Sequence, residues 1–144
     1  MTRSTQIGRE GETLAITYLK KEGYRIVEQN YRCQVGEIDI VAVDGKTICF
    51  IEVKTRSSDH YDRPEVAVHR RKQMQLSRVA LWFLKERRLE KVRARFDVVA
   101  IRRRGDLNEI DHFKNAFEMF ELGKGRCGGK GGRVGWSDRI FRRK

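Results

Sequence analysis

The length, composition and charge of the chain limit what it can be. Its 144 residues are enough for one domain with a real core, and they contain no apolar run long enough to span a membrane. The formal net charge of +12 favours a polyanionic partner, and a nucleic acid fits best. The three cysteines are too scattered for a disulfide framework or a zinc ligand set, and no signal-peptide pattern is visible, so we expect a cytoplasmic protein.

A helix is predicted over residues 5–22, where apolar residues recur at helical spacing before Gly23. Glu12 falls inside the apolar arc of this helix, three and four positions before Ala15 and Ile16. An acid on a packing face needs a partner, which makes Glu12 a candidate site residue. The alternative is that Glu12 only compensates the dipole of the first helical turns.

A strand is predicted over residues 24–31, and a hairpin of two further strands over residues 36–56. The dipeptide Asp44-Gly45 is typical of a tight turn, so the hairpin is expected to reverse there. Arg32, in the connection before the hairpin, is a candidate phosphate contact, although a solvated surface arginine would also fit this position.

The hairpin carries charged residues that its apolar pattern does not require. With a two-residue turn at Asp44-Gly45, Asp39 faces Phe50, and Asp39 and Glu52 become diagonal neighbours about 7–8 Å apart on one face. Lys54 shares that face, because alternate residues of a strand point the same way. Carboxylates this close repel unless a cation neutralises them, and Mg²⁺, with Mn²⁺ as a substitute, prefers oxygen ligands. The alternative is the solvated face of an antiparallel sheet.

A second helix is predicted from about residue 64 to residue 88, with an apolar stripe that includes Leu76 and Phe83. Its N-terminal half is strongly basic, and Lys72 lies on the apolar stripe, where a packing role would favour an apolar residue. This half is expected to present cations to a phosphate backbone, the alternative being a solvated basic face. The candidate nucleic-acid contacts beyond Arg32 are Arg56, Arg70, Arg71 and Lys72.

The last part of the chain divides into a strand-rich segment and a basic tail. Strands are predicted over residues 92–102 and 108–113. The tail, residues 120–144, holds seven of the thirteen glycines and half of the net charge, so it is expected to be flexible rather than to bury a core. Its aromatic residues Trp136 and Phe141 lie among arginines, a composition that suits stacking on a nucleic acid.

The order of these motifs resembles that of known nucleases. Asp39, followed on the next strand by Glu52-Val53-Lys54, is similar to the core of the PD-(D/E)xK nuclease superfamily. The longer strings Glu-Ile-Asp-Ile-Val and Phe-Ile-Glu-Val-Lys-Thr-Arg resemble the YraN-like family of small bacterial proteins, described as predicted endonucleases related in fold to Holliday-junction resolvases. The resemblance covers roughly residues 7–119 and includes the spacing from Glu12 to Gly23.

This resemblance implies a fold of the α/β class. The expected architecture is a restriction-endonuclease-like core in the order α-β-β-β-α-β, with a mixed central sheet flanked by helices. The nuclease-like domain would occupy residues 1–119, and residues 120–144 would follow as the basic tail.

The resemblance also implies a site and an activity. Asp39 and Glu52 would bind Mg²⁺ together with the carbonyl of Val53. Lys54 would orient or help to activate the attacking water, and Glu12 would complete the ligand set. The implied activity is metal-dependent endonucleolytic cleavage of DNA, with branched or structured DNA as one substrate class, and paired cuts would call for a homodimer. Two alternatives stay open: a non-catalytic nucleic-acid-binding protein on a nuclease-like fold, and an RNA-binding or ribosome-associated protein.

Overall fold

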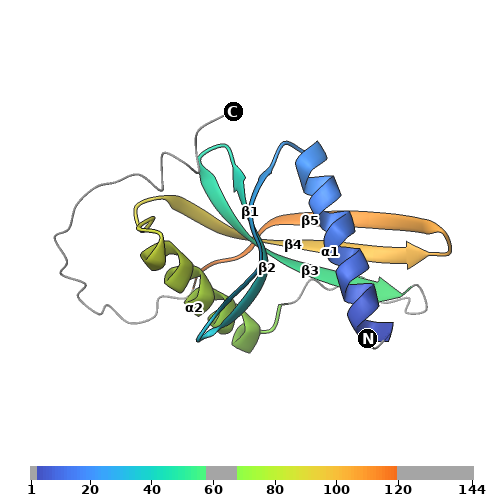
Figure 1. Ribbon diagram of the computed structural model, residues 1–144, viewed down its shortest axis with the longest axis horizontal. Helices are drawn as coiled ribbons and strands as arrows, with labels where there is room; N and C mark the ends of the chain where they lie inside the picture. The colour runs from blue at the N-terminus through green and yellow to red at the C-terminus, as the bar shows by residue number, and fades with distance from the viewer. Residues whose placement is uncertain (1–2, 58–67, 120–144) are drawn as a thin grey trace.

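The computed structural model describes residues 3–57 and 68–119 of the chain. Within these residues, helices and strands follow one another in the order α-β-β-β-α-β-β (Figure 1), which confirms the predicted α/β class. The elements are α1 Arg3–Lys21, β1 Arg25–Cys33, β2 Gly36–Asp44, β3 Thr47–Ser57, α2 Arg70–Glu86, β4 Arg93–Arg104 and β5 Leu107–Phe117. Neither of the two helices is long and apolar enough to cross a membrane. The predicted tail, residues 120–144, lies outside the described residues.

The strands form one sheet in the order β1-β2-β3-β4-β5. β3 and β4 pair in parallel and the other neighbours pair antiparallel, so the sheet is mixed, as predicted. The parallel pair ends at Ser57 and Arg103, which brings the C-terminal ends of both strands to one edge. β5 spans Leu107–Phe117 and is longer than the strand predicted over residues 108–113, because its pairing with β4 continues past a register shift to Phe117 opposite Phe96. Gly105, with a φ of +59°, lies in the tight hairpin where β5 begins.

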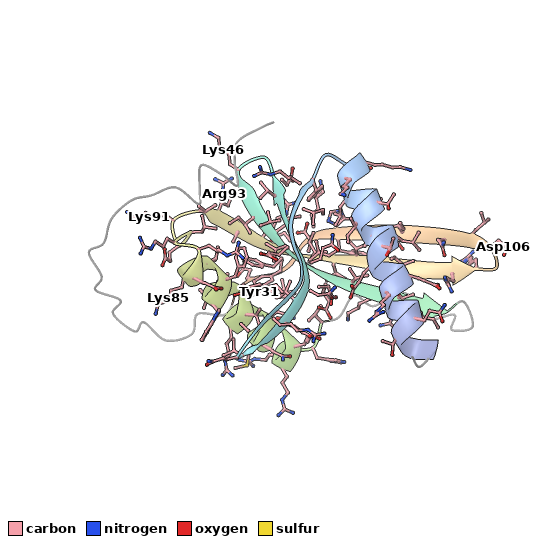
Figure 2. The ribbon with its side chains drawn as sticks, in the orientation of Figure 1. Tyr31, Lys46, Lys85, Lys91, Arg93 and Asp106 are labelled. Carbon is pink, nitrogen blue, oxygen red and sulfur yellow. The ribbon has the colours of Figure 1, made fainter. Side chains whose placement is uncertain are left out.

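The core consists of one layer on each face of the sheet. Alternate residues of β3 point to opposite faces, so Phe50 packs beneath α2, whereas Cys49 and Ile51 pack beneath α1. Figure 1 shows the two helices on the two sides of the twisted sheet. Tyr31 of β1, labelled in Figure 2, lies on the α2 side of the sheet. Its hydroxyl donates a 2.5 Å hydrogen bond to Glu86 of α2. Because Phe50 is buried in the α2 layer and Cys49 in the α1 layer, the central hairpin is buried on both faces near its turn.

The turn between β2 and β3 lies one residue later than the sequence predicted. Asp44 pairs with Thr47 as the last rung of the ladder, so Gly45 and Lys46 form the two-residue turn. Gly45 has a φ of +61°, whereas the φ of Lys46 is not positive, and this matches a type II′ turn with glycine in the first position. A turn at Asp44-Gly45, as predicted, would be of the other common hairpin type, in which both central residues have positive φ.

The later turn changes the register of the hairpin by two residues. Ile40 pairs with Ile51, and the next position along β2 and β3 places Asp39 opposite Glu52 rather than opposite Phe50 as predicted. Because side chains alternate with a period of two, a shift of two residues leaves every side chain on its original face. Asp39 and Glu52 therefore share one face of the hairpin, as expected, although the turn was predicted one residue too early.

A buried ionic network connects β4 to β5. Asp97 is 1% exposed and accepts hydrogen bonds from Arg95, from His112 and from the backbone amide of Asn115. Burial alone would raise the pKa of Asp97, but the hydrogen bonds from these three groups outweigh burial and lower it. Arg95 also donates to the hydroxyl of Tyr24, at the end of the α1 layer. The network therefore joins β4, β5 and the segment that follows α1.

Candidate functional site

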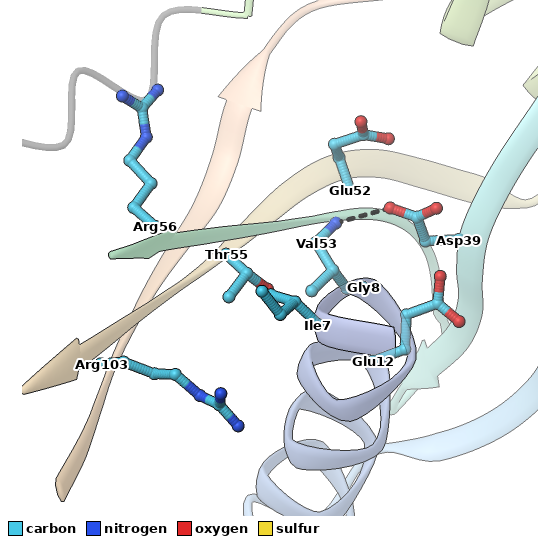
Figure 3. A pocket seen from close by; sticks show the side chains of 9 residues that line it. All are labelled: Ile7, Gly8, Glu12, Asp39, Glu52, Val53, Thr55, Arg56 and Arg103. Carbon is cyan, nitrogen blue, oxygen red and sulfur yellow. Dashed lines mark hydrogen bonds between the residues drawn. The ribbon is translucent and has the colours of Figure 1, made fainter. Parts of the chain in front are cut away.

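An open pocket of about 500 Å³ lies where β2, β3 and β4 meet the N-terminal half of α1 (Figure 3). Its lining consists of Ile7, Gly8, Glu12, Asp39, Glu52, Val53, Thr55, Arg56 and Arg103. Five residues singled out from the sequence thus meet in one place: Glu12, Asp39, Glu52, Val53 and Arg56. Figure 3 shows the carboxylates gathered toward one end of the pocket, with the guanidinium groups of the two arginines toward the other.

Asp39 lies where β2 and β3 separate. The ladder between these strands ends at Ile40 and Ile51, and beyond it the amide of Val53 donates a 2.8 Å hydrogen bond to Asp39 Oδ2. Burial raises the pKa of Asp39, the Val53 hydrogen bond opposes this, and the negative charge of Glu12 raises the pKa further. The Asp39 side chain is therefore held in a fixed position where its charged form is disfavoured.

Glu52 is in a similar electrostatic position. Burial and the neighbouring charge of Asp39 raise the pKa of Glu52 to about 7. Lys72 Nζ lies 3.7 Å from Glu52 Oε1 and lowers the pKa, and the charge of Lys54 acts in the same direction. Because the pKa remains raised, these two lysines do not fully offset burial and repulsion, and a further cation near the two carboxylates would be stabilising.

Glu12 reaches the pocket from α1. Its Oε2 accepts a 3.1 Å hydrogen bond from Asn30 Nδ2, so the partner expected for an acid on this helix face is a β1 side chain. Asn30 has a φ of +51°, a conformation that asparagine tolerates better than most residues. The charge of Glu12 acts on Asp39, as the raised pKa of Asp39 indicates. Glu12 therefore belongs to the same acidic group as the hairpin carboxylates.

The donor set fits a hard cation with few protein ligands. The described residues contain no group of three or more His, Cys, Asp or Glu side chains that could hold a metal ion. The Mg²⁺ site that the resemblance implies would use Asp39, Glu52 and the carbonyl of Val53, and water would take the other positions. The amide and carbonyl of a strand residue point toward the same neighbouring strand, so the Val53 carbonyl faces the gap that its amide shares with Asp39. A set made only of oxygen atoms suits Mg²⁺ or Mn²⁺.

The other predicted cations lie outside the pocket lining. Lys54 is half-buried on β3, and its charge acts on Glu52. Arg32 pairs with Glu37 at 3.1 Å, and its side chain is 77% exposed. Arg70 and Arg71 are exposed in the first turn of α2. α2 is first described at Arg70, and the start predicted near residue 64 falls among residues 58–67, outside the described part of the chain.

Arg103 is a pocket residue that the sequence did not single out. It lies on β4 and forms an ion pair with Glu10 of α1, which connects the far wall of the pocket to the helix that carries Glu12. The parallel register aligns Arg103 with the end of β3. The available signal was the run of three arginines at residues 102–104, at the end of a predicted strand. Its meaning depended on the parallel pairing, which the sequence did not reveal.

Gly11 sets how closely α1 approaches the pocket. A Cβ at Gly11 would overlap Thr55 Oγ1 on β3, whereas a Cβ at Gly8 would meet no atom within 4 Å. We expect Gly11→Ala to destabilise the fold by about 1–3 kcal/mol, because α1 or Thr55 must move. Gly8→Ala, the matched control in the same helix, should stabilise it by about 0.5–1 kcal/mol. Urea denaturation of both variants checks this, and equal effects would contradict the proposed close approach.

The fold and the site together define a class of protein. A mixed five-stranded sheet with a helix on each face, and a carboxylate-lined pocket where its central hairpin opens, is an α/β protein with a restriction-endonuclease-like core. The chain belongs to the uncharacterised protein family UPF0102, the YraN-like family, whose model matches residues 11–101. The resemblance seen in the sequence is therefore confirmed.

Relatives from several bacteria match most of the chain. A UPF0102 protein of Geobacter metallireducens is 54% identical over 114 residues, which cover 78% of this chain and 93% of the relative. A UPF0102 protein of Syntrophus aciditrophicus is 50% identical over 119 residues, covering 83% and 94%. A third, from Thermodesulfovibrio yellowstonii, is 46% identical over 112 residues, covering 78% and 96%. These names identify the family and state no activity.

Proposed function

We propose that the chain is a metal-dependent endonuclease that hydrolyses phosphodiester bonds in DNA. One observation carries this proposal: Asp39 and Glu52 are partly buried, are not fully offset by positive charge, and line an open pocket that also contains arginines. A carboxylate pair that favours a cation, next to groups that bind phosphate, is an arrangement suited to phosphodiester hydrolysis. The net charge of +12 supports a nucleic acid as the substrate.

In this proposal the chain's own residues hold and orient the reacting groups. Asp39, Glu52 and the Val53 carbonyl would hold Mg²⁺, which when bound would lower the pKa of a water molecule and place positive charge beside the developing transition state. The Val53 amide keeps Asp39 oriented, through the 2.8 Å hydrogen bond. Asn30 holds Glu12 beside the pocket, where the other carboxylate oxygen of Glu12 would be able to accept a hydrogen bond from water.

Two lysines lie close enough to Glu52 to be candidates for orienting the attacking water. Lys54 has the position that the PD-(D/E)xK pattern implies, two residues after Glu52 on the same strand. Lys72, from α2, is the lysine in ion-pair distance of Glu52, at 3.7 Å. We assign Lys54 to the water and Lys72 to the neutralisation of Glu52 and of an incoming phosphate.

The arginines provide the phosphate-binding side of the site. Arg56 and Arg103 line the pocket from β3 and β4. A guanidinium group binds two phosphate oxygens at once, which fixes the position of the nucleic-acid backbone. We assign these two residues to the phosphates that flank the bond to be cleaved.

Cleavage assays with defined substrates test the proposal. The full-length protein is incubated with Mg²⁺ or Mn²⁺ and duplex, single-stranded, flapped or four-way-junction DNA, and with RNA of the same sequence. We expect metal-dependent cuts in at least one DNA substrate, and a loss of at least about 100-fold in Asp39→Asn. Asp111→Asn, which replaces a partly exposed carboxylate of β5 that pairs with Arg102, is the matched control and should cleave like the wild type.

The outcomes separate the proposal from its alternatives. A wild-type protein that binds these substrates and cuts none supports the non-catalytic nucleic-acid-binding alternative. Preferential binding or cutting of RNA supports the RNA-associated alternative. Cleavage that persists in Asp39→Asn would show that the activity belongs to another site.

A further inference from the structure

α2 carries a line of cations with one tryptophan among them. Arg71, Arg78 and Lys85 recur every seven residues, and Trp82 lies four residues after Arg78 and three before Lys85. At 3.6 residues per turn, these four side chains fall within an arc of roughly 60°. We call Arg71, Arg78, Trp82 and Lys85 the α2 stripe.

The α2 stripe lies opposite the face that packs on the sheet. The buried residues of the helix are Leu76, Ser77, Val79, Ala80, Phe83 and Leu84. Trp82, by contrast, is 40% exposed, and Lys85 points away from the sheet (Figure 2). In the part of the chain that the structure describes, no acid forms an ion pair with Arg71, Arg78 or Lys85. A large exposed aromatic ring among uncompensated cations contributes little to the core and indicates a binding surface.

The α2 stripe begins next to the candidate active site. Lys72, the neighbour of Arg71, contacts Glu52 at 3.7 Å, so the first turn of α2 lies beside the pocket. From Arg71 to Lys85 the helix rises about 21 Å, at 1.5 Å per residue. This length is enough for several phosphates of one nucleic-acid strand to lie along the helix. A strand bound in the pocket would therefore lie close to the first turn of α2, where the α2 stripe begins.

The chemistry of the α2 stripe favours a single strand over a duplex. The cations suit any polyanion, but an exposed indole ring gains binding energy only from the face of an unstacked base. In a continuous duplex, base faces are covered by neighbouring base pairs, whereas single-stranded segments leave them accessible. The tryptophan therefore distinguishes between these two forms of nucleic acid.

We propose that the α2 stripe binds a single-stranded segment next to the cleavage site, with Trp82 stacked on a base and the three cations on phosphates. Substrates would then have a single-stranded or branched region beside the bond that is cut, and uninterrupted duplex would be a poor substrate. The position of the cut rests on the proposed function, but binding to the stripe requires no metal and no cleavage.

Tryptophan fluorescence without metal tests this proposal directly. The full-length chain with Trp136→Phe retains Trp82 as its one tryptophan, since the sequence has two. In EDTA, short oligo(dT) should quench Trp82 fluorescence, whereas duplex of equal length and polyglutamate should quench it weakly. Quenching by polyglutamate equal to that by oligo(dT) would point to an acidic protein partner and overturn the proposal, as would no quenching by oligo(dT).

Affinity measurements by fluorescence anisotropy of labelled DNA give a second, independent readout. Trp82→Ala should weaken oligo(dT) binding by about 5- to 150-fold, the loss of one stacked base, and duplex binding by less than about twofold. Arg78→Gln should reduce the salt dependence of oligo(dT) binding by the equivalent of one phosphate contact. The control for charge is Lys20→Gln, an exposed lysine of α1 on the other face of the sheet. Circular dichroism verifies that each variant is folded.

Each result bears on only one of the two proposals. Unchanged oligo(dT) affinity in Trp82→Ala overturns the role of the α2 stripe, whatever the cleavage assays show. A protein that binds oligo(dT) through the α2 stripe but cuts no substrate would support the role of the stripe. It would contradict the proposed nuclease activity. A protein that cuts uninterrupted duplex as fast as branched DNA is a nuclease whose substrate preference is not set by the stripe.

Discussion

Replacing Glu52 with glutamine is expected to abolish metal-dependent cleavage while making the metal-free protein more stable. A glutamine is a weak ligand for Mg²⁺, so the proposed site loses one of its two carboxylates, and the cleavage rate should fall on the order of 1000-fold. Burial and the charge of Asp39 raise the pKa of Glu52 to about 7, so its charged form destabilises the native state. We expect Glu52→Gln to gain on the order of 1–3 kcal/mol near pH 8.

The stability gain should depend on pH in a defined direction. The folded-state pKa of Glu52 lies above its ordinary value of 4.5, so its favourable contribution is complete below that pH and is lost as the pH rises through about 7. Glutamine does not titrate, and the difference between variant and wild type should therefore grow with pH. Urea denaturation in EDTA across this range measures it.

The control for Glu52 is Glu109→Gln, which replaces a half-exposed carboxylate of β5 that pairs with Arg104 at 3.7 Å. It should change neither cleavage nor the pH dependence of stability. Glu52→Gln with wild-type cleavage would remove this residue from the site. A variant less stable than wild type near pH 8 would show that the contact with Lys72 outweighs burial and repulsion.

Asp97→Ala is expected to cause the largest loss of stability among these substitutions. It would leave the guanidinium of Arg95 and the ring of His112 without their common buried partner, and the amide of Asn115 without an acceptor. Breaking a buried ion pair by removing one partner costs about 3–5 kcal/mol. Urea denaturation at neutral pH measures the loss.

A surface ion pair provides the comparison for Asp97. Asp111 lies 2.9 Å from Arg102 and its side chain is 41% exposed, so Asp111→Ala should cost no more than about 1 kcal/mol. Because hydrogen bonds lower the pKa of Asp97, its contribution is present above the unfolded-state pKa and is lost as pH falls through the folded-state pKa. The gap between wild type and Asp97→Ala should shrink in acid. Equal losses in the two variants would contradict the role of the network.

The features that the sequence predicted well depend on short-range periodicity. The alternation in the central hairpin places Asp39 and Glu52 on one face whether the turn is Asp44-Gly45 or Gly45-Lys46. The two turns differ in register by two residues, and a shift of two leaves each side chain on its face. The position of Glu12 in the apolar arc of α1 likewise follows from helical spacing alone. Periodicity thus predicted the faces on which these residues lie, and the resemblance to the family placed all three in one expected site.

The features that the sequence missed depend on contacts between distant segments. Lys72 reaches Glu52 only because α2 covers the face of β3 that carries this residue. Arg103 enters the pocket only because β4 pairs with β3 in parallel. Asp97 looks like an ordinary interruption of an apolar strand, and its partner His112 lies on a different strand. Periodicity within one element carries no information about such pairings.

The parallel pairing of β3 with β4 has a consequence for the newly made chain. The pocket takes side chains from Ile7 through Arg103, nearly the full span of the described fold. A chain grows from its N-terminus, and long-range parallel pairing forms late because it closes a large loop. A nascent chain that stops before β4 therefore contains all of the pocket's acids but lacks Arg103 and the strand that supports β3. The complete pocket, with whatever chemistry it performs, exists only after nearly the whole domain has left the ribosome.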